Sequence, residues 1–242
     1  MRNSRYRQLI GQNAPRQDAS LPVIQAKTTD AGVEVLIYDV IDPWWGVSAK
    51  GFADAIAGAG DRPLTVRLNS PGGDVFDGRA IASMIRAHKG PTKAIIDGLA
   101  ASAASTIAVA ANETVMATGA FLMVHNSWAF AMDNATGLRQ MADLLEKIDG
   151  QIGADYAAKA GVTPEQAKAW MDAETWFTAE EAVTAGLAAS VLEDAASIKD
   201  FNLSAFERAP QALINRIAAQ NDNAQAVTAL RNAAERRMRL YG

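Results

Sequence analysis

Two side chains of complementary chemistry each follow an apolar segment of the chain. Ser102 comes after residues 97–101 and opens a run of small residues, and His125 comes after the apolar residues 121–124. A neutral imidazole accepts a proton near pH 7, and a serine hydroxyl becomes a nucleophile when such a base activates it. Taken singly, Ser102 could simply cap a helix and His125 could be a hydrogen-bonded structural histidine. If the two meet, they form the reacting pair of an acyl-transfer enzyme.

A pair of glycines offers the third part of such a site. Residues 69–73, Asn-Ser-Pro-Gly-Gly, lie between a segment that is typical of a buried strand and a segment that is typical of a helix. Glycine adopts backbone conformations closed to other residues and lets N–H groups approach a ligand. Such an N–H can belong to an oxyanion hole, which stabilises the charge of a tetrahedral intermediate. Alone, the turn is weak support, since most Pro-Gly-Gly turns only reverse the chain.

Composition narrows the chemistry and the classes of partner. The 242-residue chain contains no cysteine, which excludes a disulfide framework, a thiol nucleophile and a cysteine zinc site. Its 23 Lys and Arg against 27 Asp and Glu give a net charge of -4, so nothing favours nucleic acid as the main ligand. The small and apolar stretch 99–111 is too short to span a bilayer, and no apolar core of a signal peptide follows the first arginines. We expect a cytoplasmic protein with no membrane contact.

The apolar pattern predicts strands that alternate with helices. Such alternation indicates βαβ units, a mainly parallel sheet and an α/β fold. The expected strands are 33–38, 64–68, 92–97, 114–116 and 121–124, and the expected helices begin near Ser48 and cover 77–88, 102–111, 135–159, a segment from Thr163, and 178–186. Ser105 falls within the helix that Ser102 opens, where we expect it to serve in packing.

Three parts of the chain differ in composition. Residues 1–30 are polar and lack periodicity, which predicts a flexible arm. Residues 31–194 carry the strand and helix signals and form the expected catalytic domain. Residues 195–242 drift to Ala, Asn, Gln and Arg and predict a helical or flexible tail. The adjacent Trp44 and Trp45 favour the core or a subunit contact over ligand binding, because large aromatic side chains usually serve as apolar mass.

Four motifs in one order resemble those of the ClpP peptidase family. They are residues 69–73 (Asn-Ser-Pro-Gly-Gly), 98–102 (Gly-x-Ala-Ala-Ser), 123–125 (Met-Val-His) and 177–187 (Phe-Thr-Ala-Glu-Glu-Ala-Val-x-x-Gly-Leu). The resemblance covers roughly residues 33–194. It implies the ClpP/crotonase fold of repeated ββα units, with the helix at about 135–159 as a protruding handle.

The resemblance also implies roles for individual residues. It implies Ser102 as the nucleophile, His125 as the general base, and the N–H groups of Gly73 and Ala103 as the oxyanion hole, with no metal or organic cofactor. The family's third member is an aspartate shortly before the last motif, and here both Asp172 and Glu174 stand there. We favour Asp172 as the residue that orients the base, and the choice between the two stays open because geometry defines the role.

A finer resemblance concerns the ClpP-like proteases of tailed bacteriophages. It is carried by residues 44–47 (Trp-Trp-Gly-Val), 73–78 (Gly-Asp-Val-Phe-Asp-Gly) and 174–177 (Glu-Thr-Trp-Phe). It implies a head maturation protease that cleaves scaffold or capsid protein in the host cytoplasm or the prohead. The family also implies a homo-oligomer, in the form of a heptameric ring or stacked rings, and leaves the need for an ATPase partner open.

Other functions compete with this one. The chain could be a general ClpP-type degradative peptidase that works with an ATPase. It could be a crotonase-like acyl-CoA enzyme on the same fold, although Ser102 and His125 at nucleophile and base positions argue against that chemistry. It could also be a catalytically silent ring or scaffold component.

Overall fold

The computed structural model describes residues 24–195 and 201–219 of the chain. Most of the predicted arm at 1–30 and the arginine-rich end of the predicted tail lie outside the described residues. The division of the chain into arm, catalytic domain and tail stays a prediction.

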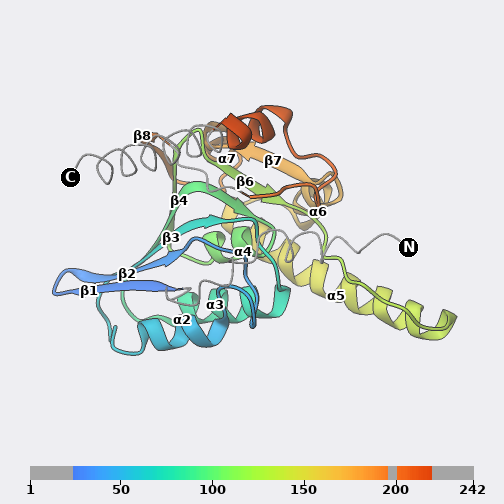
Figure 1. The fold of residues 1–242 in the computed structure, drawn as a ribbon, viewed down its shortest axis with the longest axis horizontal. Helices are drawn as coiled ribbons and strands as arrows, with labels where there is room; N and C mark the ends of the chain where they lie inside the picture. The colour runs from blue at the N-terminus through green and yellow to red at the C-terminus, as the bar shows by residue number, and fades with distance from the viewer. Residues whose placement is uncertain (1–23, 196–200, 220–242) are drawn as a thin grey trace, which may run out of the picture.

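A mixed sheet of eight strands is the centre of the described part of the chain (Figure 1). Its main path runs β1-β2-β3-β4-β5-β8, and β6 and β7 branch from β4. Neighbouring strands are parallel except in the pairs β1–β2 and β6–β7. The strands are β1 (Gln25–Thr29), β2 (Gly32–Ile37), β3 (Leu64–Ser70), β4 (Thr92–Ala101), β5 (Glu113–Thr118), β6 (Phe121–Val124), β7 (Thr175–Thr178) and β8 (Ser190–Ala195). The predicted α/β class is confirmed.

Helices α2, α3 and α4 pack against one face of this sheet, and helix α5 extends away from it (Figure 1). In β2, alternate side chains are buried beneath the helices, and Val35 and Ile37 are fully inaccessible. The long helix α5 comes between β6 and β7 in the chain and projects outward from the sheet as the predicted handle (Figure 1). The helices are α2 (Ala49–Ile56), α3 (Val75–Ala87), α4 (Ala103–Val109), α5 (Ala135–Ala160), α6 (Pro164–Asp172) and α7 (Ala179–Thr184).

Strand β4 is longer than its sequence predicts, and this length places the site. The pattern predicts an end at Asp97, because the following Gly-Leu-Ala-Ala looks like a turn into a helix, but β4 continues to Ala101. Its first half pairs with β5 and its second half pairs with β6, through Leu99 to Ala101. Strand β6 supplies the hydrogen-bond partners of residues 99–101, and local propensity cannot reveal partners that lie so far along the chain. This pairing also sets the end of β4 beside the end of β6.

Trp44 and Trp45 are not in the core of the protomer, so that part of the prediction is wrong. Their exposed fractions are 83% and 53%. The Asp42 carboxylate accepts hydrogen bonds from both of their backbone N–H groups, at 2.8 Å each, and so holds the turn that presents them. The alternative prediction, a contact with another subunit, remains.

The described C-terminal residues 201–219 pack on the sheet, and we name them the strap. They begin as a series of turns and end in a helical segment at 211–219. Their buried side chains form a second core with Leu99, Ala101 and Met123 of β4 and β6. In Figure 1 the strap, coloured red, lies beside β6 and β7, on the branch that carries the site.

Candidate active site

Ser102 lies between β4 and α4 in a strained backbone conformation. Its φ is +55° and its ψ is −126°, a region that side-chain-bearing residues rarely occupy. A helix-capping role is one expectation from the sequence, but the Ser102 hydroxyl makes no capping hydrogen bond in the described structure. The sharp turn instead leaves the hydroxyl available for another partner. Backbone strain of this kind clusters at functional sites.

A chain of hydrogen bonds holds that strained turn from both sides. The Ser102 N–H donates to the carbonyl of Met123 at 3.0 Å, which ties the turn to β6. The Ser105 hydroxyl donates to the Ser102 carbonyl at 2.6 Å and lies 2.7 Å from the hydroxyl of Tyr156. Tyr156 is fully buried, and that burial raises its pKa. The handle helix therefore supports the turn that carries Ser102.

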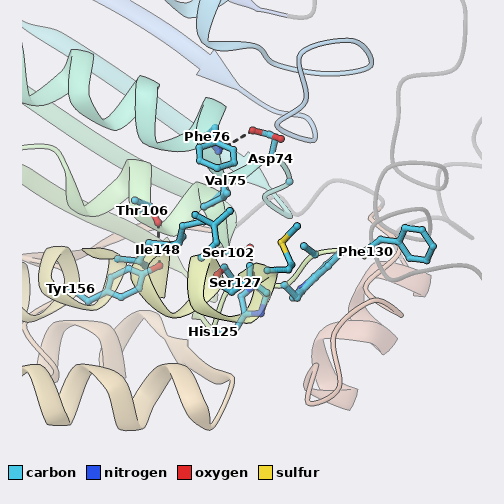
Figure 2. A pocket seen from close by; sticks show the side chains of 18 residues that line it. Asp74, Val75, Phe76, Ser102, Thr106, His125, Ser127, Phe130, Ile148 and Tyr156 are labelled. Carbon is cyan, nitrogen blue, oxygen red and sulfur yellow. Dashed lines mark hydrogen bonds between the residues drawn. The ribbon is translucent and has the colours of Figure 1, made fainter. Parts of the chain in front are cut away.

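His125 directly follows β6 and meets Ser102. The distance from His125 Nε2 to Ser102 Oγ is 2.7 Å, a hydrogen bond between side chains 23 residues apart in sequence (Figure 2). The segment after His125 is fixed by the Asp149 carboxylate of α5, which accepts a hydrogen bond from the Ser127 N–H at 2.6 Å. A hydroxyl this close to an imidazole nitrogen can transfer its proton without a large rearrangement.

Two backbone N–H groups border this pair. Gly73 forms an isolated β-bridge to Ile41, in which the neighbouring Gly72 carbonyl and Asp74 N–H bond Ile41 at 2.8 and 2.7 Å. The Gly72 carbonyl and the Gly73 N–H belong to one trans peptide and point in opposite directions, so the Gly73 N–H is turned away from Ile41. Ala103 is the first residue of α4, and a first helical N–H has no partner within its helix. Both residues line the cavity that contains Ser102 and His125.

The two carboxylates near the site have other described partners. Asp172 accepts hydrogen bonds from Asn126 at 2.9 Å and from Lys168 at 2.7 Å, and these two donors, Asn126 first, hold its pKa below the usual value. Glu174 accepts from the backbone N–H groups of Glu207 and Arg208 at 3.0 and 2.6 Å. The hydrogen bonds described for these two carboxylates therefore go to residues other than His125.

A cavity of about 350 Å³ opens beside Ser102 and His125 (Figure 2). One wall is the handle helix, which contributes Met141, Leu144, Leu145, Ile148 and Ile152. Another wall comes from Val75 and Phe76 at the start of α3. This lining is mainly apolar, so the cavity suits an apolar side chain of a ligand.

Sequence reasoning predicts the contact between Ser102 and His125 but misses the residues that support it. The sequence assigns Ser105 to packing alone, whereas its hydroxyl bonds the Ser102 backbone. Tyr156 does not stand out in the sequence, although it lies at helical spacing from Ile148 and Ile152, so that the three form one face of α5. That spacing predicts the buried face but gives no sign of the hydroxyl's partner.

The fold and this Ser–His pair together define a serine hydrolase on a mixed α/β scaffold. A family model described as Clp protease matches residues 55–195. The chain belongs to the Clp protease family, and it is a serine-type peptidase, a proteolytic subunit of the ClpP type.

Curated relatives and a solved structure agree with that family. The chain is 30% identical over 141 residues to the ATP-dependent Clp protease proteolytic subunit 2 of Treponema denticola, covering 57% of this chain and 70% of the relative. It is 29% identical over 170 residues to the protein of the same name from Gluconobacter oxydans, covering 69% and 76%. A structure of a ClpP1 point mutant from Listeria monocytogenes, 24% identical, superposes with a TM-score of 0.57 over 66% of this chain and 91% of that one, which supports the fold.

The helices of the described residues do not qualify as membrane spans. Among residues 24–195 and 201–219, no helix combines the length and the apolar character that crossing a bilayer requires.

Proposed function

We propose that this chain cleaves peptide bonds with Ser102 as nucleophile and His125 as general base. The observation that carries the proposal is the 2.7 Å hydrogen bond between Ser102 Oγ and His125 Nε2 at the mouth of an apolar cavity. Ser102 Oγ attacks the carbonyl carbon of the substrate while its proton passes to His125 Nε2. The carbon–nitrogen bond then breaks as His125 returns that proton to the leaving amine. Water, activated by the same imidazole, hydrolyses the acyl-enzyme.

The N–H groups of Gly73 and Ala103 supply the oxyanion hole in this proposal. The charge that develops on the carbonyl oxygen needs donors that are already oriented before the reaction. The bridge to Ile41 orients Gly73, and the start of α4 orients Ala103. Such donors stabilise the tetrahedral intermediate more than the ground-state carbonyl.

The experiment that tests the function is covalent labelling with a fluorophosphonate probe. We expect the purified wild-type chain to gain one probe adduct by intact mass, on the peptide that contains Ser102. We expect His125→Ala to lose that labelling, because the hydroxyl is then no longer activated. A folded wild-type chain that takes up no probe would favour the alternative of a silent ring or scaffold component.

Asp172 is our proposed orienting residue for His125. Asn126, which directly follows His125, already donates a hydrogen bond to the Asp172 carboxylate. The Asp172 side chain is 47% exposed, so its rotation toward the imidazole meets little obstruction. Catalytic hydrogen bonds often tighten only when substrate binds. We expect Asp172→Asn to lower kcat by on the order of 10²- to 10⁴-fold.

Glu174→Gln is the matched variant, since it also removes one carboxylate charge two residues away. It keeps one carbonyl acceptor and sets an amide NH2 group against the second strap N–H, so we expect a smaller loss, about 10-fold or less. Peptide hydrolysis by both variants under one set of conditions measures the difference. The opposite order of effects would remove Asp172 from the orienting role.

The apolar cavity supports a preference for substrates with an apolar side chain next to the scissile bond. The physiological substrate in our proposal is a scaffold or capsid protein of a bacteriophage prohead, supported by the phage-like segments at 44–47, 73–78 and 174–177. We further propose a ring-shaped homo-oligomer, in which the exposed Trp44 and Trp45 provide a subunit contact.

A degradative ClpP-type role is the second candidate function. It is favoured by the names of the curated relatives, which are ATP-dependent Clp protease proteolytic subunits. Degradation of a stably folded reporter only when a Clp ATPase and ATP are added would support this role. Cleavage of a coexpressed capsid or scaffold protein without any ATPase would support head maturation.

A further inference from the structure

We propose that Phe206 of the strap is a positioning residue for His125, and that residues 201–219 belong to the catalytic unit. The inference rests on the proposed function. The matched family region ends at residue 195, so the strap lies outside it. The strap contacts the proposed base through the ring of Phe206, whereas Ser102 hydrogen-bonds the base through Nε2.

The contact itself joins two rings. The Phe206 and His125 ring centroids are 5.7 Å apart, with an angle of 88° between the ring planes. Phe206 is only 6% exposed, and it makes a second edge-to-face contact with Trp176 at 5.6 Å and 79°. Edge-to-face pairs at such distances are favourable. A phenyl ring has no hydrogen-bonding group of its own, so it restrains the tilt of the imidazole without competing for its hydrogen bonds.

The strap is anchored by polar contacts at two places. The Glu174 carboxylate accepts hydrogen bonds from the N–H groups of Glu207 and Arg208. The Arg208 guanidinium donates a hydrogen bond to the Ala173 carbonyl at 2.7 Å. In the later, helical part, Arg216 donates to the Gly119 carbonyl at 2.7 Å. These bonds fix Phe206 in place rather than leaving it on a loosely attached tail.

Glu174 has a strained conformation at this anchor. Its φ is +46°. Among the described non-glycine residues, Ser102 and Glu174 have a positive φ. Strain of this kind persists only where surrounding contacts impose it. The two backbone N–H groups that Glu174 accepts come from the residues that directly follow Phe206. The strained residue is therefore the one that anchors the backbone next to Phe206.

Apolar packing places the strap against the segments that lead into both reacting residues. Its side chains bury Leu99 and Ala101, which lead into Ser102, and Met123, which precedes His125 by two residues. The carbonyl of Met123 also accepts the Ser102 N–H. One small core thus supports the backbone on both sides of the 2.7 Å hydrogen bond between Ser102 and His125. The strap members of that core are Phe201, Leu203, Ala205, Phe206, Leu213 and Ile217.

A misplaced imidazole is costly because proton transfer depends on geometry. A displacement of about 1 Å from the productive position can lower a rate about 100-fold. We expect Phe206→Ala to lower kcat for a fluorogenic peptide by about 10- to 100-fold, with KM changed by less than about 3-fold. We expect the rate constant for fluorophosphonate labelling of Ser102 to fall in parallel.

Three variants separate positioning from stability. Phe52→Ala removes a fully buried ring of α2 from the main core, outside both the strap core and the cavity lining, so it lowers stability while leaving kcat within about 3-fold of wild type. Phe206→Tyr keeps the ring and should keep kcat. Phe206→Leu keeps apolar bulk without the ring and should lose kcat, and it should shift the pH dependence of labelling. Each variant is measured at a temperature where circular dichroism shows it folded.

Each outcome decides the proposal. Equal losses in Phe52→Ala and Phe206→Ala, or full activity in Phe206→Leu, would mean that Phe206 only packs. Unchanged kcat in Phe206→Ala, in a protein whose wild type hydrolyses peptide and is labelled at Ser102, would overturn the proposed role of the strap. The proposed function would then still stand. A wild-type chain that is never labelled at Ser102 would overturn the proposed function instead.

Discussion

Replacement of Ser102 by alanine is expected to abolish peptide hydrolysis while leaving the fold intact. The described hydrogen bond of the Ser102 hydroxyl goes to His125, and the hydroxyl caps no helix. Loss of a serine nucleophile lowers kcat by on the order of 10⁴-fold or more, because only oxyanion stabilisation and binding remain. Hydrolysis of a fluorogenic peptide at saturating concentration measures this loss.

The same variant should unfold at nearly the wild-type temperature. The backbone contacts of Ser102 to Met123 and Ser105 do not involve its hydroxyl, and alanine bears the same backbone strain as serine. We expect the free energy of unfolding to change by less than about 1 kcal/mol. Retained hydrolysis would mean that another residue is the nucleophile. Loss of both activity and fold would mean that Ser102 is mainly structural.

The contact between Ser102 and His125 could be predicted from sequence because the signal is an ordered set of motifs. Ser102 and His125 are separated by 23 positions, and each stands next to a strand, so a parallel sheet that ends both strands at one edge brings them together. The motif order thus predicts the pair without knowledge of distances. What it cannot provide is the positive φ of Ser102, a conformation held by a hydrogen bond to β6 and supported from α5 through Ser105.

The contact of the strap with His125 and with strands β4 and β6 could not be predicted, for a different physical reason. Residues 201–205 alternate apolar and polar side chains, a pattern that favours a strand, yet residues 201–210 form no strand in the structure. Their partners, Leu99 and Met123, lie about a hundred positions away and are already explained as strand residues. Glu174 shows the same limit, because its carboxylate is bonded by amides of the strap that only the tertiary structure places there. The local sequence pattern predicts the helices and strands, whereas long-range packing determines which of them contact one another.

Replacement of Gly73 by alanine is expected to disable the site through the backbone. The φ of Gly73 is +146°, and a Cβ atom there would overlap the carbonyl oxygen of Ile41. That carbonyl already accepts the Asp74 N–H at 2.7 Å, so the bridge must shift to make room. A shifted bridge moves the Gly73 N–H away from the developing oxyanion. Loss of one such donor lowers kcat by on the order of 10²- to 10³-fold.

Gly58→Ala provides the control for this variant. A Cβ atom at Gly58 has no neighbour within 4 Å, and the residue lies beyond the end of α2, away from the cavity. We expect wild-type kcat from Gly58→Ala, whereas Gly73→Ala should lose kcat and also about 1–3 kcal/mol of unfolding free energy from strain. Peptide hydrolysis and thermal unfolding of both variants measure the two effects. Normal kcat in a folded Gly73→Ala chain would exclude the Gly73 N–H from the oxyanion hole and leave Ala103 as its proposed donor.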